Sequence, residues 1–134
     1  MLKRYFLPCR KISRFALLNA IAQKNLPEAL ELLQKEKKHG GSAIAVSGLI
    51  AFQVRRLAQV KELAAQGMNQ QMAASALKMS PYAVKKLMEQ CRNFTAQSLS
   101  EFMLALADFN ANIRYGGRQF EMLEEILIRF LGKR

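Results

Sequence analysis

The fold of this chain is decided by residues 52–94, which read FQVRRLAQVKELAAQGMNQQMAASALKMSPYAVKKLMEQCRNF. This stretch has the pattern of a long helix that ends at Gly67, followed by two short helices joined by residues 78–81. The sequence before it reads as a helical approach, and the sequence after it reads as a helical hairpin that closes a bundle. The expected fold class is therefore all-α, a compact bundle of six or seven helices.

The composition favours the same fold class. Ala, Leu, Lys, Gln and Glu dominate, and they are helix formers, while Gly and Pro number only 7 and 3. A chain of 134 residues can bury roughly two-thirds of its unfolded surface, so it needs no disulfide or metal to fold. We expect a basic tail or linker over residues 1–11, where Leu7-Pro8 disfavours helix, and a single helical domain over residues 12–134.

The chain is strongly basic, with a formal net charge of +11. Such a balance favours polyanionic partners, for example nucleic acid or acidic protein surfaces. A solvated charge excess, enlarged by one tail, explains the same number equally well. Five of the basic residues fall in the first fourteen positions: Lys3, Arg4, Arg10, Lys11 and Arg14.

The expected localisation is cytoplasmic. Cys9 and Cys91 have no CxxC spacing, which is typical of free thiols in a reducing compartment. No run approaches the ~18 apolar residues that a membrane span requires, so we expect no membrane contact. The apolar core of the N-terminus, YFLP at residues 5–8, is too short for a secretory signal.

Capping residues and glycines mark the expected helix boundaries. Asn25, Ser42 and Ser80 stand where N-caps are favoured, and glycine pairs at residues 40–41 and 116–117 stop helices. Helices are expected over residues 12–23, 26–38, 43–66, 69–77 and 81–92, then from a cap at Thr95 or Ser98 to the second glycine pair, and over residues 119–131.

Apolar periodicity predicts which faces of these helices are buried. The first helix is expected to bury Phe15 and Leu18, and the second ends in the polar run QKEKKH. The longest helix has a wide apolar stripe, which suggests packing on more than one neighbour. That stripe comprises Val46, Leu49, Ile50, Leu57, Val60, Leu63 and Ala64, and it is widened by Phe52 and Val54.

Residues that could carry catalysis are scarce. The only histidine, His39, sits at a polar helix end, and no His or Cys lies near the glutamates of residues 121–125 to complete a metal site. No GxxxxGK[ST] loop is present to hold a nucleotide phosphate. We therefore expect no cofactor, no metal and no enzymatic activity for this chain on its own.

The two short helices have the spacing of a helix-turn-helix, so one hypothesis is a DNA-binding regulator that uses residues 69–92. Lys78 departs from that pattern, because the turn usually has a glycine where the backbone needs a positive φ. The apolar residues that would lock the turn are Ala74, Leu77, Met79, Val84 and Leu87. The candidate DNA contacts are Ser80, Tyr82, Lys85 and Lys86.

The same residues also belong to a longer pattern that a helix-turn-helix does not predict. Residues 53–57, QVRRL, match a Q-[FL]-R-like segment on a long helix. The form A-x-x-L-x-x-x-P-x-x-V-x-K is matched by Ala74, Leu77, Pro81, Val84 and Lys86, and Q-x-R-x-[FL] by Gln90, Arg92 and Phe94. From about Phe15 to Leu131 the chain resembles the C-terminal domain of the bacterial DNA polymerase III delta subunit, a part of the sliding-clamp loader.

The resemblance implies an assembly role in DNA replication. In that family the C-terminal helical domain joins its counterparts into a circular collar that holds the loader together. The implied partners are other clamp-loader subunits, of the tau/gamma and delta-prime types, within the DNA polymerase III holoenzyme. Non-specific DNA contact is possible through the charge, but sliding-clamp contact is not expected, because the clamp-binding wedge lies in domains that precede this one.

Five polar residues are the candidates for the subunit interface. They are Arg55, Arg56, Gln90, Arg92 and Arg114, and each is expected to hydrogen-bond across an interface or within the domain. The alternative is that some of them only decorate solvated faces. The family often carries an acidic residue four positions before a basic one near the end of the sixth helix; here Asn110 stands at the acidic position and Arg114 at the basic one, so at best a hydrogen bond replaces the ion pair. An unrelated helical scaffold remains a third hypothesis.

Overall fold

The structure is a computed structural model that describes residues 14–112 and 118–132. Within these ranges every element of regular secondary structure is a helix, as expected, and turns and loops join the helices. The first helix is described over residues 14–22, and the others are α2 (Leu26–Lys38), α3 (Ala43–Ala65), α4 (Gln70–Leu77), α5 (Pro81–Gln90), the 3-10 helix η1 (Cys91–Asn93), α6 (Ala96–Asn112) and α7 (Gln119–Leu131). The predicted tail at residues 1–11, Cys9 and Arg114 lie outside the described residues.

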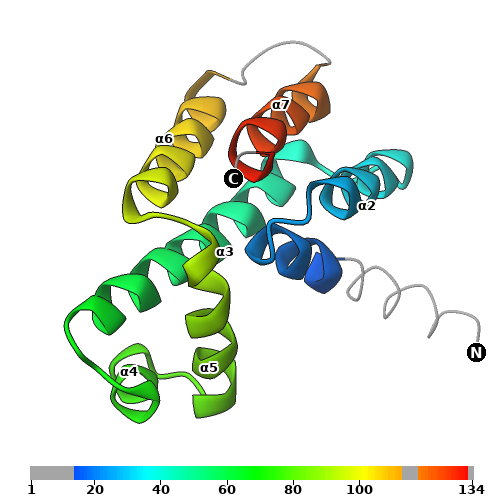
Figure 1. Cartoon of the computed structure of the whole chain (residues 1–134). Helices are drawn as coiled ribbons and strands as arrows, with labels where there is room; N and C mark the ends of the chain where they lie inside the picture. Colours follow the sequence, from blue (N-terminus) through cyan, green and yellow to red (C-terminus); the bar gives the residue numbers. More distant parts are fainter. Residues whose placement is uncertain (1–13, 113–117, 133–134) are drawn as a thin grey trace, which may run out of the picture.

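The long helix α3 is the element on which the others assemble (Figure 1). It packs against α5, α6 and α7, and α2 packs against α7 on the side away from α4 and α5. The short helices α4 and α5 lie at the C-terminal end of α3, where α4 packs mainly on α5 and α5 packs on both α4 and α3. The molecule therefore has a larger part around α2, α6 and α7 and a smaller hairpin of α4 and α5.

The predicted caps Asn25, Ser42 and Ser80 fix helix starts, and Asn69, which was expected as the first residue of the fourth helix, is a cap as well. Asn25, Ser42, Asn69 and Ser80 each accept a hydrogen bond from the backbone N–H three residues later. Thr95 starts α6 in a reciprocal arrangement, because its Oγ1 accepts from the Ser98 N–H at 2.9 Å while its own N–H donates to Ser98 Oγ at 3.1 Å. Each of these bonds satisfies a backbone donor that the helix leaves unpaired.

The core is one large cluster and a small satellite. The large cluster includes the stacked rings of Phe102 and Phe130, whose centroids lie 4.8 Å apart. The satellite holds α4 on α5 through the buried side chains of Ala73, Ala74 and Val84, and Leu63, Met79 and Met88 are partly buried against it. Since small side chains bury little apolar area, the α4–α5 hairpin has less hydrophobic stabilisation than the rest of the bundle.

Two predicted faces were wrong in part. Phe15 is 63% exposed, because the first helix turns Leu17 and Ile21 into the core instead. In the polar end of α2, Glu36 is only 2% exposed, and Arg14 Nε donates to its Oε1 at 3.3 Å. A buried carboxylate needs such a partner, and the partner lies on another helix.

Three smaller departures concern α3 and the end of α5. Ala64 and Phe52 are exposed rather than part of the buried stripe. The helix α5 ends at Gln90 instead of Arg92, and the chain continues as η1. By length and composition alone α3 could also cross a membrane, because an 18-residue stretch of it has a mean hydropathy of 1.2. The expectation that no segment approaches the apolar length of a membrane span was therefore wrong. A core helix passes the same test, and α3 buries Val46 to Val60 along one side against its neighbours.

Candidate subunit interface

The α4–α5 hairpin has the turn that the sequence predicted. Lys78 ends α4 in the left-handed conformation, with φ 56° and ψ 46°, at the position where glycine was expected. Its backbone N–H and that of Met79 bond back to the last turn of α4. Ser80 is exposed and caps α5, accepting from the Ala83 N–H at 3.2 Å. The side chains of Tyr82, Lys85 and Lys86 are all exposed.

The predicted interface residues lie in different settings. Arg55 is exposed on α3 and Arg92 is exposed on η1. The guanidinium of Arg56 lies over the Phe52 ring, 5.1 Å from its centroid. Gln90 is 7% exposed, and its Nε2 donates to Asn19 Oδ1 at 3.0 Å. Gln90 is therefore held by an intradomain hydrogen bond, while the three arginines remain accessible.

A groove between the first helix, α3 and α5 brings several of these residues together. We call it the aromatic groove; its volume is about 340 Å³. Phe15, Phe52 and Tyr82, one from each helix, stand at it with exposures of 63%, 49% and 76%. The other lining residues are Leu18, Asn19, Gln53, Met79, Ala83, Lys86, Leu87 and Gln90. The sequence indicated Tyr82 as a DNA contact and Lys86 both as a DNA contact and as a residue of the delta-family pattern, but it gave no signal that Phe15 joins them.

Hydrogen bonds between distant residues hold this groove in shape. Besides the Gln90–Asn19 bond, Gln53 Nε2 donates to the Leu18 carbonyl at 3.3 Å. Asn93 Nδ2 donates to the Ala22 carbonyl at 3.0 Å, next to Phe94, which is buried and has Lys24 Nζ 5.4 Å from its ring centroid. These bonds tie the first helix to α3, α5 and η1.

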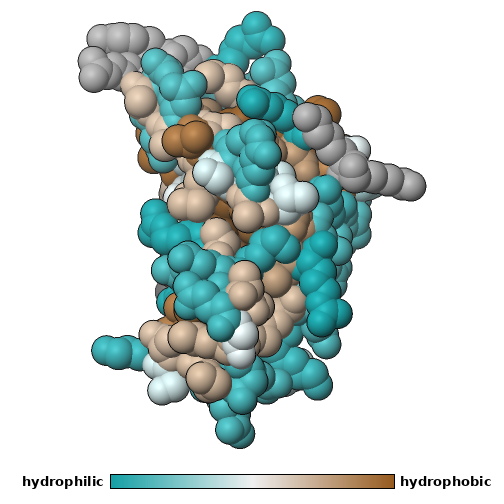
Figure 2. Space-filling view, turned by 60° about the vertical axis from the view of Figure 1, so that its left-hand side comes forward, coloured by the Kyte–Doolittle hydropathy of each residue, from teal (hydrophilic) through white to brown (hydrophobic). Residues whose placement is uncertain are grey.

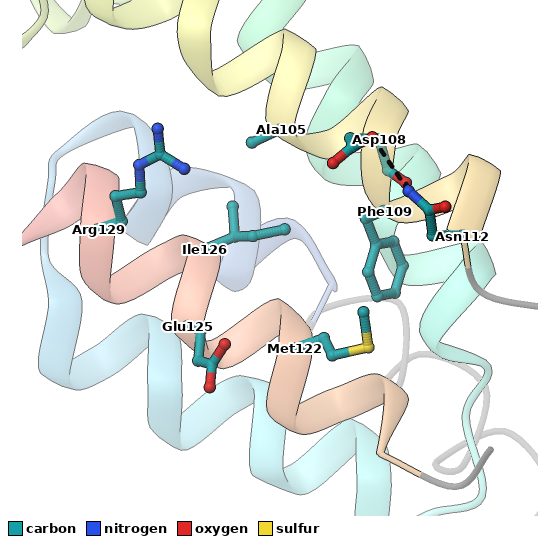
Figure 3. Close-up of a pocket in the computed structure, with 8 residues that line it drawn as sticks. All are labelled: Ala105, Asp108, Phe109, Asn112, Met122, Glu125, Ile126 and Arg129. Carbon is teal, nitrogen blue, oxygen red and sulfur yellow. Dashed lines mark hydrogen bonds between the residues drawn. The ribbon is translucent and has the colours of Figure 1, made fainter.

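A second groove lies between α6 and α7 and has a volume of about 280 Å³ (Figure 3). Phe109 of α6 and Met122 of α7 point toward one another across it. Asn112 Nδ2 donates to the Asp108 carboxylate at 3.0 Å, which is the dashed line in the figure. Glu125 and Arg129 complete its charged lining, and we call it the α6–α7 groove.

Exposed apolar side chains flank the α6–α7 groove. Leu104 of α6 is 66% exposed and lines a shallow extension of the groove with Glu101 and Asp108. Ile128 of α7 is half exposed. Figure 2 shows, over one face of the molecule, that apolar residues reach the surface between hydrophilic ones along its length. Scattered apolar residues are normal on a surface, so the grooves carry more information than the individual side chains.

Charge is distributed unevenly between the two parts of the molecule. Eight of the ten acidic residues lie on α2, α6 and α7. None of the described residues that line the aromatic groove is acidic, and Lys86 is its cation. One end of the molecule is therefore cationic and aromatic, whereas the other carries most of the carboxylates.

Comparison with known proteins decides between the hypotheses. The family described as the DNA polymerase III delta subunit, C-terminal domain, matches residues 12–130. The chain belongs to this family. The delta-family resemblance of the sequence is thereby confirmed, and the helix-turn-helix regulator is not favoured.

Two Bacillus subtilis proteins show how much of a delta subunit the chain represents. DNA polymerase III subunit delta is 32% identical over 120 residues, which are 90% of this chain and 35% of that protein. The solved structure of the DNA clamp loader delta protein has a TM-score of 0.77 and 30% identity, again over 90% of this chain and 36% of the other. The chain spans about a third of the length of these relatives.

The delta-family motifs have a structural explanation. In the Q-x-R-x-[FL] block, Gln90 bonds Asn19 of the first helix and Phe94 is buried in the core, while Arg92 between them is exposed. In the QVRRL segment, Val54 and Leu57 are core residues and Gln53 bonds the first helix. The motifs therefore build the aromatic groove and leave their arginines accessible.

Two groups near these surfaces have shifted pKa values. Burial raises the pKa of the Cys91 thiol above its usual 9.0. The contribution of the protonated thiol to folding stability is therefore complete below pH 9.0 and is lost as the pH rises through the pKa of the folded state. The pKa of the Glu121 carboxylate is lowered below 4.5 by a hydrogen bond from the backbone N–H of Glu121 itself, at the start of α7. Lys37, whose Nζ lies 3.5 Å from Glu121 Oε2, lowers this pKa further. That contribution is present above pH 4.5 and is lost as the pH falls through the folded pKa.

Proposed function

We propose that this chain is the assembly domain of a clamp-loader delta subunit and joins other loader subunits, of the tau/gamma and delta-prime types, in the cytoplasm. The observation that carries the proposal is the delta-family match over residues 12–130. The domain itself would supply no catalysis, because its part in the loader is to hold subunits together. Sliding-clamp contact would belong to other domains of the delta subunit.

The two unlike grooves support this proposal. A ring of subunits that meet head to tail requires each member to present two different surfaces, one to each neighbour. The aromatic groove lies beside α5, and the α6–α7 groove lies at the other part of the molecule, so one neighbour could occupy each (Figure 1). We assign the aromatic groove, with Arg56 stacked on its Phe52 ring and with Arg55 and Arg92 exposed on α3 and η1, to one neighbour and the α6–α7 groove to the other.

The residue types at the grooves suit protein contacts. Interfaces are enriched in aromatic residues, Met and Arg, and a few such anchors supply most of the binding free energy. Phe15, Phe52 and Tyr82 are anchors of this kind, and Arg56 stacks on one of them. The +11 charge adds non-specific affinity for DNA, which should fall steeply with salt.

Co-elution tests the proposal directly. The chain is mixed with tau/gamma-type and delta-prime-type subunits and passed over a size-exclusion column at moderate salt, with nuclease-treated proteins so that DNA cannot bridge them. We expect the chain to move to the position of the larger complex. Elution at its own 15.2 kDa, with the other subunits assembled without it, would contradict the proposal.

A further inference from the structure

We infer that the aromatic groove binds an amphipathic helix of a neighbouring loader subunit, one whose apolar ridge is flanked by carboxylates. The inference rests on the proposed function, since it names the partner chemistry at one of the two assembly surfaces. It is carried by the shape of the groove, by the charge of its lining and by the bonds that hold it open.

The shape of the groove suits a helix. It lies between three helices, with Leu18, Met79 and Leu87 among its lining residues and an aromatic side chain contributed by each helix. Helix-in-groove recognition places apolar residues at i, i+3, i+4 and i+7 into such a surface. Phe15 and Tyr82 are more than half exposed, so they have much apolar area left to bury on binding.

The charge of the groove selects an acidic partner. Lys86 lines it, Arg56 stacks on Phe52 beside it, and no acidic residue is among its described lining. Charges at the rim of an interface steer association and disfavour partners of the same sign. A helix with carboxylates beside its apolar ridge would therefore bind, whereas a basic helix would be repelled.

The groove is also organised before any partner binds. The bonds Gln90–Asn19 and Gln53–Leu18 join its three helices, and Gln90 is buried beneath it. A preformed surface loses little conformational entropy on association, so more of the contact energy appears as affinity. This distinguishes it from a set of exposed side chains with no fixed geometry.

Two other occupants are weaker candidates. Single-stranded nucleic acid also uses aromatic rings and cations, but it needs a track of cations along its backbone, and only Lys86 among the lining residues is charged. A second copy of the chain could offer α6, where Leu104 stands beside Glu101 and Asp108. That possibility makes self-association a necessary control.

The experiment compares two neighbouring lysines on α5. Lys85 and Lys86 are both exposed, but only Lys86 lines the groove. Affinity for a purified complex of tau/gamma-type and delta-prime-type subunits is measured by titration for the wild type, Lys86→Glu, Tyr82→Ala and the matched control Lys85→Glu. We expect Kd to rise about tenfold for Lys86→Glu and Tyr82→Ala, and less than about threefold for Lys85→Glu. Circular dichroism confirms that each variant is folded.

The outcomes separate the inference from the proposed function. Suppose that the wild type binds the complex, but Lys85→Glu and Lys86→Glu weaken binding equally or leave it unchanged. The groove inference is then wrong, and the assembly role stands. If the wild type does not bind at all, the proposed function fails and the inference falls with it. Self-association of the chain at micromolar concentration, or binding of a (dT)20 oligonucleotide that is lost in Tyr82→Ala, would overturn the inference in favour of those occupants.

Discussion

The two grooves of this domain are built in different ways. The α6–α7 groove lies between two helices packed over large apolar side chains, among them the stacked Phe102 and Phe130. The aromatic groove is held by side-chain hydrogen bonds between residues as far apart as Asn19 and Gln90. The first depends on hydrophobic packing, which is insensitive to direction, and the second depends on a few directional bonds. Substitutions beneath each groove should therefore differ in magnitude.

The largest effect is expected beneath the α6–α7 groove. Phe102 is fully buried, so Phe102→Ala removes its stacking on Phe130 and leaves a cavity. The free energy of unfolding should fall by about 3–5 kcal/mol, as measured by urea denaturation. A loss below about 1 kcal/mol would show that the two helices do not depend on this core.

A smaller effect is expected beneath the aromatic groove. Gln90→Ala leaves the Asn19 side chain without its donor in a partly buried site and should cost about 1–3 kcal/mol. The neighbouring Glu89 is exposed, and Glu89→Ala should change stability by no more than about 0.5 kcal/mol. Equal effects of the two substitutions in urea denaturation would mean that the hydrogen bond contributes nothing to the groove.

The accessible arginines should affect association rather than folding. Replacing both Arg55 and Arg92 with alanine should weaken binding to the tau/gamma-type and delta-prime-type subunits by about tenfold, because each substitution removes one cation from the rim of the proposed interface. Helix content, measured by circular dichroism, should not change, since both side chains are exposed. Unaltered affinity would count against their assignment to the interface.

The smallest effect separates two lysines with positive φ. Lys78→Gly should stabilise the α4–α5 turn by about 0.5–1 kcal/mol, because glycine adopts this conformation without strain. Lys24 has the same strain, at φ 60°, but lies over the Phe94 ring. Lys24→Gly loses that contact, worth about 0.5–1 kcal/mol, so its net change in urea denaturation should be near zero. A gain from Lys24→Gly as large as that from Lys78→Gly would contradict this account of the Lys24–Phe94 contact.

Local signals in the sequence were sufficient to predict the helices. The bounds of α2 follow from Asn25, the glycine pair at residues 40–41 and apolar periodicity, and those of α7 follow from apolar periodicity. The conformation of Lys78 follows from its place in the turn. The motif residues were found, but the sequence did not show that Gln90 is buried or what it bonds.

The aromatic groove was not predictable from the sequence, because it depends on tertiary packing. Phe15, Phe52 and Tyr82 are separated by about thirty or more residues, and the orientation of the first helix decides whether they meet. Periodicity alone placed Phe15 in the core, since Leu18 lies on the same face. The burial of Glu36 was missed for the same reason, because its partner Arg14 belongs to another helix.

The central claim is that the domain meets two neighbours at once, and the mass of the assembly tests it most directly. Native mass spectrometry of the chain with tau/gamma-type and delta-prime-type subunits should show a species that contains one copy of the chain and both subunit types. The combined variant Lys86→Glu with Tyr82→Ala should reduce this species to complexes that keep only one neighbour. Detection of the chain only as a free 15.2 kDa species, with the partners assembled without it, would contradict the claim.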